Sequence, residues 1–129
     1  MSLVRCKDTK PELLVRRLVH SLGYRYRLHR ADLPGKPDMV FPARKKVIFI
    51  HGCFWHGHKC RLGRMPKSSL DYWQNKIAYN KARDQRTLRR LRNLDWKCLT
   101  IWECSLHDER RLAVRIKRFL EPLSDLERQ

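Results

Sequence analysis

Apolar side chains recur at helical spacing in three segments of the chain. The first segment begins with the capping-box pattern Thr9-Lys-Pro-Glu12 and stops before Gly23, and its apolar positions share one helix face: Leu14, Val15, Leu18, Val19 and Leu22. A second apolar stripe begins at Leu70, and a third covers residues 112–120 and ends before Pro122. These patterns predict three amphipathic helices.

Short apolar runs between the helices predict four strands. Residues 24–28 alternate between apolar and basic side chains, which is typical of a strand with one solvated face. Residues 38–41, which are apolar after Asp38, and residues 47–50 flank a polar turn, which predicts a hairpin of two buried strands, and residues 98–102 predict a further strand. The order of these elements predicts an α/β fold, a mixed β-sheet flanked by helices.

The stripe that begins at Leu70 is interrupted in its middle. Asn80, Lys81 and Asp84 stand where the helical spacing requires apolar side chains. Two interpretations remain open. The segment forms two helices broken near residue 80, or it forms one long helix that presents Asn80 and Asp84 to a polar site, because burying such groups without partners is costly.

The chain carries a large excess of positive charge. Its 129 residues include 30 Lys+Arg and 13 Asp+Glu, which gives a formal net charge of +17. A nucleic acid is therefore the expected partner, and a nucleic-acid packing protein without chemistry is the alternative. The length and the 42% apolar fraction predict a single domain over residues 1–129, with mobile ends at 1–10 and 123–129.

Signals for membrane insertion and secretion are missing from the sequence. No run reaches the roughly 18 apolar residues of a membrane span, and the N-terminal residues do not form the apolar core of a signal peptide. We therefore expect a cytoplasmic protein without a membrane partner.

Soft metal ligands crowd into one short segment. Because the five cysteines are an odd number in a chain without a secretory signal, a disulfide framework is improbable. Cys53, His58 and Cys60 can converge within one loop, and Cys104, at the end of a strand of the same sheet, is the natural fourth ligand. Four protein ligands make a closed, structural zinc site. The alternative is a group of buried thiols beside a solvated histidine-rich loop.

Two histidines and one aspartate remain as candidates for catalysis. His51 and His56 flank the metal-binding turn without being needed as its ligands. Asp38 opens an apolar strand, where a carboxylate is costly unless it has a partner. Phosphodiester hydrolysis uses such a carboxylate to hold Mg²⁺. The alternative for Asp38 is a strand-start cap or an ion pair with Lys36.

Four sequence motifs together resemble the very-short-patch-repair (Vsr) DNA mismatch endonucleases. They are Leu33-Pro-Gly-Lys-Pro-Asp38, Ile48-Phe-Ile-His-Gly-Cys-Phe-Trp-His-Gly-His-Lys-Cys60, Tyr72-Trp73 and Trp102-Glu-Cys104, and the resemblance runs from about Glu12 to Phe119. It implies a restriction-endonuclease-like (PD-(D/E)XK-type) fold and an Mg²⁺-dependent nick in one DNA strand, 5′ of the thymine in a T·G mismatch. The implied partners are mismatched double-stranded DNA and other mismatch-repair proteins, and we expect a monomer.

The resemblance also implies roles for individual residues. It implies zinc on Cys53, His58, Cys60 and Cys104, in agreement with the spacing. It further implies Mg²⁺ on Asp38 and on the main-chain carbonyl of Ile50, with His56 as general base, His51 as the group that positions water or phosphate, and Glu12 and Asp84 as supporting acids.

DNA contacts complete the implied site. Phe54, Trp55 and Trp73 resemble the family's aromatic wedge, which is inserted beside the mismatch, where unstacking costs least. We expect basic side chains such as Arg83, Arg86 and Arg90 to contact phosphates.

The sequence departs from the family pattern in two places. Ile50 replaces the usual threonine, and few residues precede the first predicted helix, so that the basic N-terminal arm of the family is nearly absent. A zinc-stabilised nucleic-acid-binding module without catalysis, or a related nuclease of different DNA specificity, remains the alternative to the mismatch enzyme.

Overall fold

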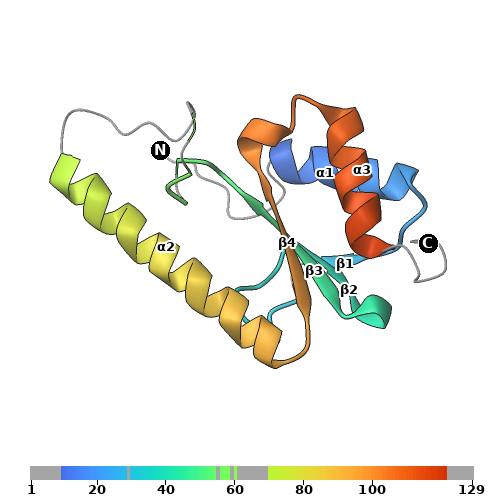
Figure 1. Ribbon diagram of the computed structural model, residues 1–129, viewed down its shortest axis with the longest axis horizontal. Coiled ribbons are helices and arrows are strands. Elements are labelled where there is room, and N and C mark those ends of the chain that lie inside the picture. Colours follow the sequence, from blue (N-terminus) through green and yellow to red (C-terminus); the bar gives the residue numbers. More distant parts are fainter. Residues whose placement is uncertain (1–9, 29, 55, 59, 61–69, 122–129) are drawn as a thin grey trace, which may run out of the picture.

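The computed structural model describes residues 10–28, 30–54, 56–58, 60 and 70–121 (Figure 1). These residues form the helices α1 (Lys10–Ser21), α2 (Leu70–Asn93) and α3 (Glu109–Leu120). They also form the strands β1 (Arg27–Leu28), β2 (Met39–Phe41), β3 (Lys46–His51) and β4 (Lys97–Trp102), and two single-turn helices, η1 (Pro42–Arg44) and η3 (Glu103–Ser105). The order of helices and strands predicted from the sequence is confirmed.

The four strands form one mixed sheet in the order β1-β2-β3-β4. The pairs β1–β2 and β2–β3 are antiparallel, whereas β3 and β4 are parallel and are connected through α2. Parallel neighbours end at the same edge of a sheet, and the register pairs His51 with Trp102 at that edge. The segments that follow β3 and β4 therefore start side by side.

Helices cover both faces of the sheet, with α1 and α3 on one side and α2 on the other (Figure 1). Side chains of β3 alternate between these layers, since Ile48 belongs to the α1–α3 core and its neighbours Val47 and Phe49 belong to the α2 core. This explains why β3 is apolar at successive positions. The fully buried side chains at the centre of the α1–α3 core include Val15, Val19, Met39, Ile48, Ile101, Leu112 and Ile116.

The strand predicted over residues 24–28 is shorter than expected. Only Arg27 and Leu28 pair, with Val40 and Met39, and both side chains are exposed. Tyr24 precedes the strand and is buried in the α1–α3 core, packed beside helical side chains. β1 is an edge strand and pairs only with β2, so the length of β1 depends on how far β2 extends. The apolar and basic alternation of residues 24–28 does not contain this information.

Helix α2 is continuous through its polar middle, so the interpretation of two helices broken near residue 80 is wrong. Asn80 is buried and Asp84 is half-buried, and both lie on the side of α2 that faces the rest of the protein. Within the described ranges, every helix is too short or too polar to span a membrane.

Candidate active site and metal centre

Four metal-ligand side chains meet where β3 and β4 end. Cys53, His58 and Cys60 come from the loop after β3, and Cys104 comes from η3 directly after β4. One ligand atom from each of the four side chains lies within 4.8 Å of all the others. The backbone N–H of Cys104 donates to Cys53 Sγ at 3.4 Å, and Cys104 Sγ lies 3.5 Å from His58 Nδ1. The convergence predicted from the ligand spacing is confirmed.

The donor set of this cluster fits a tetrahedral metal ion. In a tetrahedral zinc site with Zn–S bonds of about 2.3 Å, neighbouring ligand atoms lie about 3.8 Å apart, within the spread of this cluster. Cys53 is fully buried. Burial and hydrogen bonds to the thiols of Cys60 and Cys104 raise the pKa of Cys53 to about 12, against the lowering effect of the Cys104 N–H. A bound cation would provide the charge that such a buried thiolate needs.

The loop between Cys53 and His58 packs closely on α2. Gly57 has a φ of +64°, and a Cβ atom there would lie 2.5 Å from Ile77 Cγ2 and 2.7 Å from Lys81 Cδ. Only glycine allows this backbone conformation and this approach without strain. The N–H of His58 also donates to the Cys53 carbonyl at 2.9 Å, so the turn is closed on itself. The same turn carries His56 toward the middle of α2.

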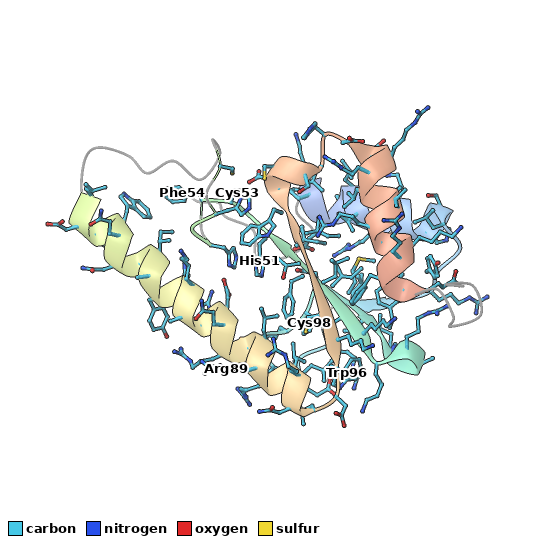
Figure 2. The ribbon with its side chains drawn as sticks, in the orientation of Figure 1. His51, Cys53, Phe54, Arg89, Trp96 and Cys98 are labelled. Carbon is cyan, nitrogen blue, oxygen red and sulfur yellow. The ribbon has the colours of Figure 1, made fainter. Side chains whose placement is uncertain are left out.

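Two imidazoles and one carboxylate form a second cluster beside the metal ligands. His51 ends β3, His56 lies in the loop, and Asp84 lies in the middle of α2. The His56 Nδ1 and the Asp84 Oδ2 are 2.5 Å apart. The rings of His51 and His56 are stacked, with centroids 3.7 Å apart and an interplanar angle of 1°. Figure 2 shows His51 in the space between β4 and α2.

Burial and neighbouring charges set the protonation states of this cluster. Burial and the neighbouring His56 lower the pKa of His51 to about 4, so His51 is neutral at pH 7. Burial alone would raise the pKa of Asp84, but its hydrogen bond to His56 and the nearby His56, His51 and Arg83 together outweigh that effect and lower the pKa, so Asp84 is a carboxylate. A carboxylate at Nδ1 fixes the proton there and leaves the lone pair of His56 on Nε2. The His51 Nδ1 is buried without a hydrogen-bond partner among the described residues.

A pair of acids lies at the same end of β3, toward α1. Asp38 Oδ2 accepts a hydrogen bond of 2.7 Å from the backbone N–H of Ile50. Glu12 of α1 is buried, lies next to Asp38, and receives a hydrogen bond of 3.0 Å from Arg16. Burial and the carboxyl of Glu12 raise the pKa of Asp38 to about 7, although the Ile50 N–H acts in the opposite direction.

The acid pair suits a hard divalent cation. The carboxyls of Asp38 and Glu12 are neighbours, and Arg16 forms an ion pair with Glu12. Mg²⁺ takes carboxylate oxygens as ligands. Because the N–H and C=O of one strand residue point to the same edge, the carbonyl of Ile50 faces the side on which Asp38 lies. Asp38 is not a member of the cluster of His51, His56 and Asp84, although Ile50, whose N–H donates to Asp38, directly precedes His51.

The aromatic residues implied as a DNA wedge are only partly described. Phe54 and Trp73 contact each other edge to face, with ring centroids 5.2 Å apart, and both are half-buried outside the two core clusters. Figure 2 shows Phe54 between the loop and α2. Trp55 lies outside the described residues. Phe54 and Trp73 are thus brought together, at the end of the molecule that holds the metal ligands.

Two residues near the site were not identified from the sequence. Trp102 stacks on His58 with ring centroids 4.2 Å apart and contacts His51 edge to face at 5.3 Å. Its position at the end of β4, opposite His51 in the parallel register, is the signal that could have revealed it. Arg16, one helical turn after Glu12, balances the acid pair.

Comparisons with known proteins agree with the geometry. Residues 1–62 match the family model described as DNA mismatch endonuclease Vsr. The chain is 55% identical over 122 residues to the type II nicking enzyme V.XorIIP of Xanthomonas oryzae pv. oryzae, which covers 95% of this chain and 90% of the relative. It is 40% identical to the type II nicking enzyme V.NmeAIP of Neisseria meningitidis, over 97% of this chain and 89% of the relative.

A third relative has the same name as the matched family model. The chain is 39% identical to the DNA mismatch endonuclease Vsr of Escherichia coli, over 88% of this chain and 72% of the relative. The alignments with the first two relatives cover 95% and 97% of this chain, so the aligned regions span the segments that carry the acid pair, the histidine cluster and the metal ligands. The chain therefore belongs to the Vsr family of DNA mismatch endonucleases and is a DNA endonuclease.

Proposed function

We propose that this endonuclease nicks one strand of double-stranded DNA 5′ of the thymine in a T·G mismatch, using Mg²⁺, and so initiates very-short-patch mismatch repair. The observation that carries this proposal is the hydrogen bond between His56 and Asp84, with the acid pair of Asp38 and Glu12 at the same end of β3. The names of the relatives from Xanthomonas and Escherichia coli, a nicking enzyme and a mismatch endonuclease, support the reaction type.

The acid pair is the proposed cation site. Asp38 and the main-chain carbonyl of Ile50 would hold Mg²⁺, and Glu12 would support them from α1. When bound, this ion supplies positive charge to the phosphoryl oxygens and lowers the pKa of a coordinated water. Asp38 needs such a cation because its carboxylate is otherwise buried beside a second acid.

The histidine pair is the proposed proton acceptor and positioning group. His56 takes a proton from the attacking water at Nε2, while Asp84 holds the ring orientation through Nδ1 and stabilises the imidazolium that forms. His51 is neutral, and its ring is parallel to that of His56, so it can hold the same water or a phosphate oxygen. The phosphorus–oxygen bond to the leaving sugar breaks as the bond to the water oxygen forms, and the leaving sugar oxygen takes up a proton from solvent water.

Zinc is the proposed occupant of the cysteine cluster. Cys53, His58, Cys60 and Cys104 would bind it in a closed site that orders the loop without taking part in the reaction. This role matters for catalysis because the same loop carries His56. The resulting architecture is the restriction-endonuclease-like fold with a structural zinc site, in one domain that acts as a monomer.

Mismatch selection is assigned to the aromatic residues. Phe54, Trp55 and Trp73 would insert beside the mispair, at a cost of a few kcal/mol that is lowest where base pairing is already weak. The enzyme would then favour a T·G site over a fully paired one through the energy of deforming the DNA. A substrate of this kind implies a cytoplasmic enzyme that acts together with other mismatch-repair proteins.

A nicking assay on matched duplexes tests the proposed function. Two labelled duplexes that differ only in a T·G or a T·A pair are incubated with the zinc-loaded enzyme, with Mg²⁺ or with chelator. We expect one nick, 5′ of the thymine, in the T·G duplex with Mg²⁺ and no nick in the other reactions. Equal cutting of both duplexes would indicate a nuclease of different specificity, and absence of any nick would favour a binding module.

The pairing of His56 with Asp84 predicts a specific kinetic defect. The Asp84→Asn variant keeps the shape of the side chain but loses the charge that stabilises the imidazolium, so we expect its single-turnover nicking rate to fall by about 100-fold. DNA affinity should change little. The matched control is Asp71→Asn, an exposed acid in the first turn of the same helix. A normal rate for Asp84→Asn would exclude the assigned role.

A further inference from the structure

One flank of α2 carries a continuous line of exposed basic side chains. Tyr79, Arg83, Arg86 and Arg90 are spaced by four, three and four residues, so they lie in one row along the helix, and all four are exposed. We call this row the α2 stripe. It continues toward the start of the helix through Lys76 and Tyr72.

The α2 stripe is positively charged along its whole length. Helix α2 contains seven Lys and Arg but only two acids, Asp71 and Asp84, and neither lies in the stripe. Asp84 is engaged by His56. Among the described residues, no carboxylate forms an ion pair with Arg83, Arg86 or Arg90. These side chains therefore do not serve the fold through internal salt bridges.

The α2 stripe passes beside the candidate active site. Arg83 directly precedes Asp84 in the helix, and its charge acts on both Asp84 and His51. Arg86 and Arg90 lie farther along α2, toward its C-terminal end and away from the loop that holds Phe54. The stripe thus leads from the reaction centre toward one end of the molecule. Figure 2 shows Arg89, which is outside the stripe, on the side of α2 that faces away from the sheet.

We propose that the α2 stripe binds the phosphate backbone of the duplex arm on one side of the cleavage site. This proposal rests on the proposed function and adds the path of the DNA. Arg86 and Arg90 bind consecutive stretches of one strand, Arg83 binds phosphate next to the reaction centre, and the hydroxyl of Tyr79, which is 63% exposed, donates to a further phosphate. The partner is double-stranded DNA, recognised through its charge rather than its sequence.

Dimensions agree with this assignment. Eleven residues separate Tyr79 from Arg90, which corresponds to about 16 Å along a helix. Successive base pairs are spaced by about 3.4 Å along the duplex axis, so a stripe that lies along this axis covers the length of about five base pairs. The proposal therefore implies an asymmetric requirement for DNA. About five base pairs on one side of the cut contribute to binding through α2, and the other arm makes no contact with the stripe.

Two double variants on α2 distinguish the contribution of the α2 stripe to DNA binding from the effect of lowering the net charge. Arg86→Gln with Arg90→Gln removes two members of the stripe. Arg89→Gln with Arg92→Gln removes the same charge from neighbouring exposed positions outside it. Dissociation constants for a T·G duplex are measured without Mg²⁺ over a range of salt concentrations. We expect the stripe variant to bind about tenfold more weakly at low salt and to reduce the salt slope by roughly 2, and we expect the control to reduce it by far less.

Trimming the duplex tests the direction of the DNA path. Shortening one arm by about five base pairs should weaken binding of the wild-type protein and leave the stripe variant unchanged, whereas shortening the other arm should affect both proteins equally. Equal losses in the two double variants, or equal sensitivity to both arms, would overturn the proposal. Because these are binding measurements, a failure of mismatch nicking in the separate cleavage assay would refute the proposed function but would not change the conclusion on DNA binding by the α2 stripe.

Discussion

The Asp38→Asn variant should lose nicking activity by about 1,000-fold or more, the largest catalytic effect that the structure predicts. Asp38 is the half-buried acid through which the chain would hold Mg²⁺. Asparagine has the same shape, and its oxygen can still accept the hydrogen bond from the Ile50 N–H. It lacks the negative charge that attracts the cation. The single-turnover rate on a T·G duplex at saturating Mg²⁺ measures this loss.

The interpretation of that loss depends on what the variant retains. A neutral amide removes the cost of a buried charge beside Glu12, so the variant should fold and melt at least as well as the wild type. Zinc content and DNA affinity should also be kept, because Asp38 is outside the cysteine cluster. Asp32→Asn, in an exposed ion pair with Arg30, is the control. Full activity of the Asp38→Asn variant would show that Asp38 does not hold the catalytic Mg²⁺.

Much of the site could be predicted from the sequence because its parts are local. His51, Cys53, His56, His58 and Cys60 lie within ten residues, and three of the four ligands of the described metal cluster come from the loop after β3. Cys104 could be added from strand order alone, because parallel strands end at the same edge of a sheet. The loop ligands could therefore be predicted from their spacing, and the fourth ligand could be predicted from the order of the strands.

The pairing of His56 with Asp84 could be anticipated only as a polar interruption of a helix. The sequence left open whether α2 breaks near residue 80, because apolar spacing cannot tell a buried polar partner from a helix end. Whether the helix continues through these polar residues depends on the contacts that they make with the rest of the protein. Gly57 lets the loop approach Ile77 closely, and that approach brings His56 to Asp84, 28 positions away in the chain.

The position of the acid pair relative to the histidine cluster could not be predicted in detail either. The sequence suggested Asp38, His51 and His56 as one catalytic group, but it does not show how side chains at the end of a strand divide between the two faces of the sheet. Ile50 packs toward α1 and α3, whereas His51 contacts Phe49 on the face toward α2. The proposed cation site and the proposed proton acceptor therefore lie beside successive residues at the end of β3, Ile50 and His51.

Replacing Cys104 with serine should cause the largest loss of stability. Cys104 is the only member of the described metal cluster outside the loop after β3, so its thiol joins that loop to the end of β4. We expect the purified variant to lose its metal ion, measured by elemental analysis, and to melt about 10 °C or more below the wild type, because metal-binding free energy contributes directly to folding. Cys98→Ser, a half-buried thiol outside the cluster, should keep the metal.

The same variant distinguishes a structural metal from a catalytic one. Loss of the ion should also lower nicking, because the loop that carries His56 would no longer be held against α2, but the DNA-binding charge of α2 would remain. Asp38→Asn should show the opposite combination, with metal retained, stability kept and chemistry lost. If Cys104→Ser keeps one equivalent of metal and a normal melting temperature, the cluster does not hold the ion. The order of the loop would then depend on the packing of Gly57 alone.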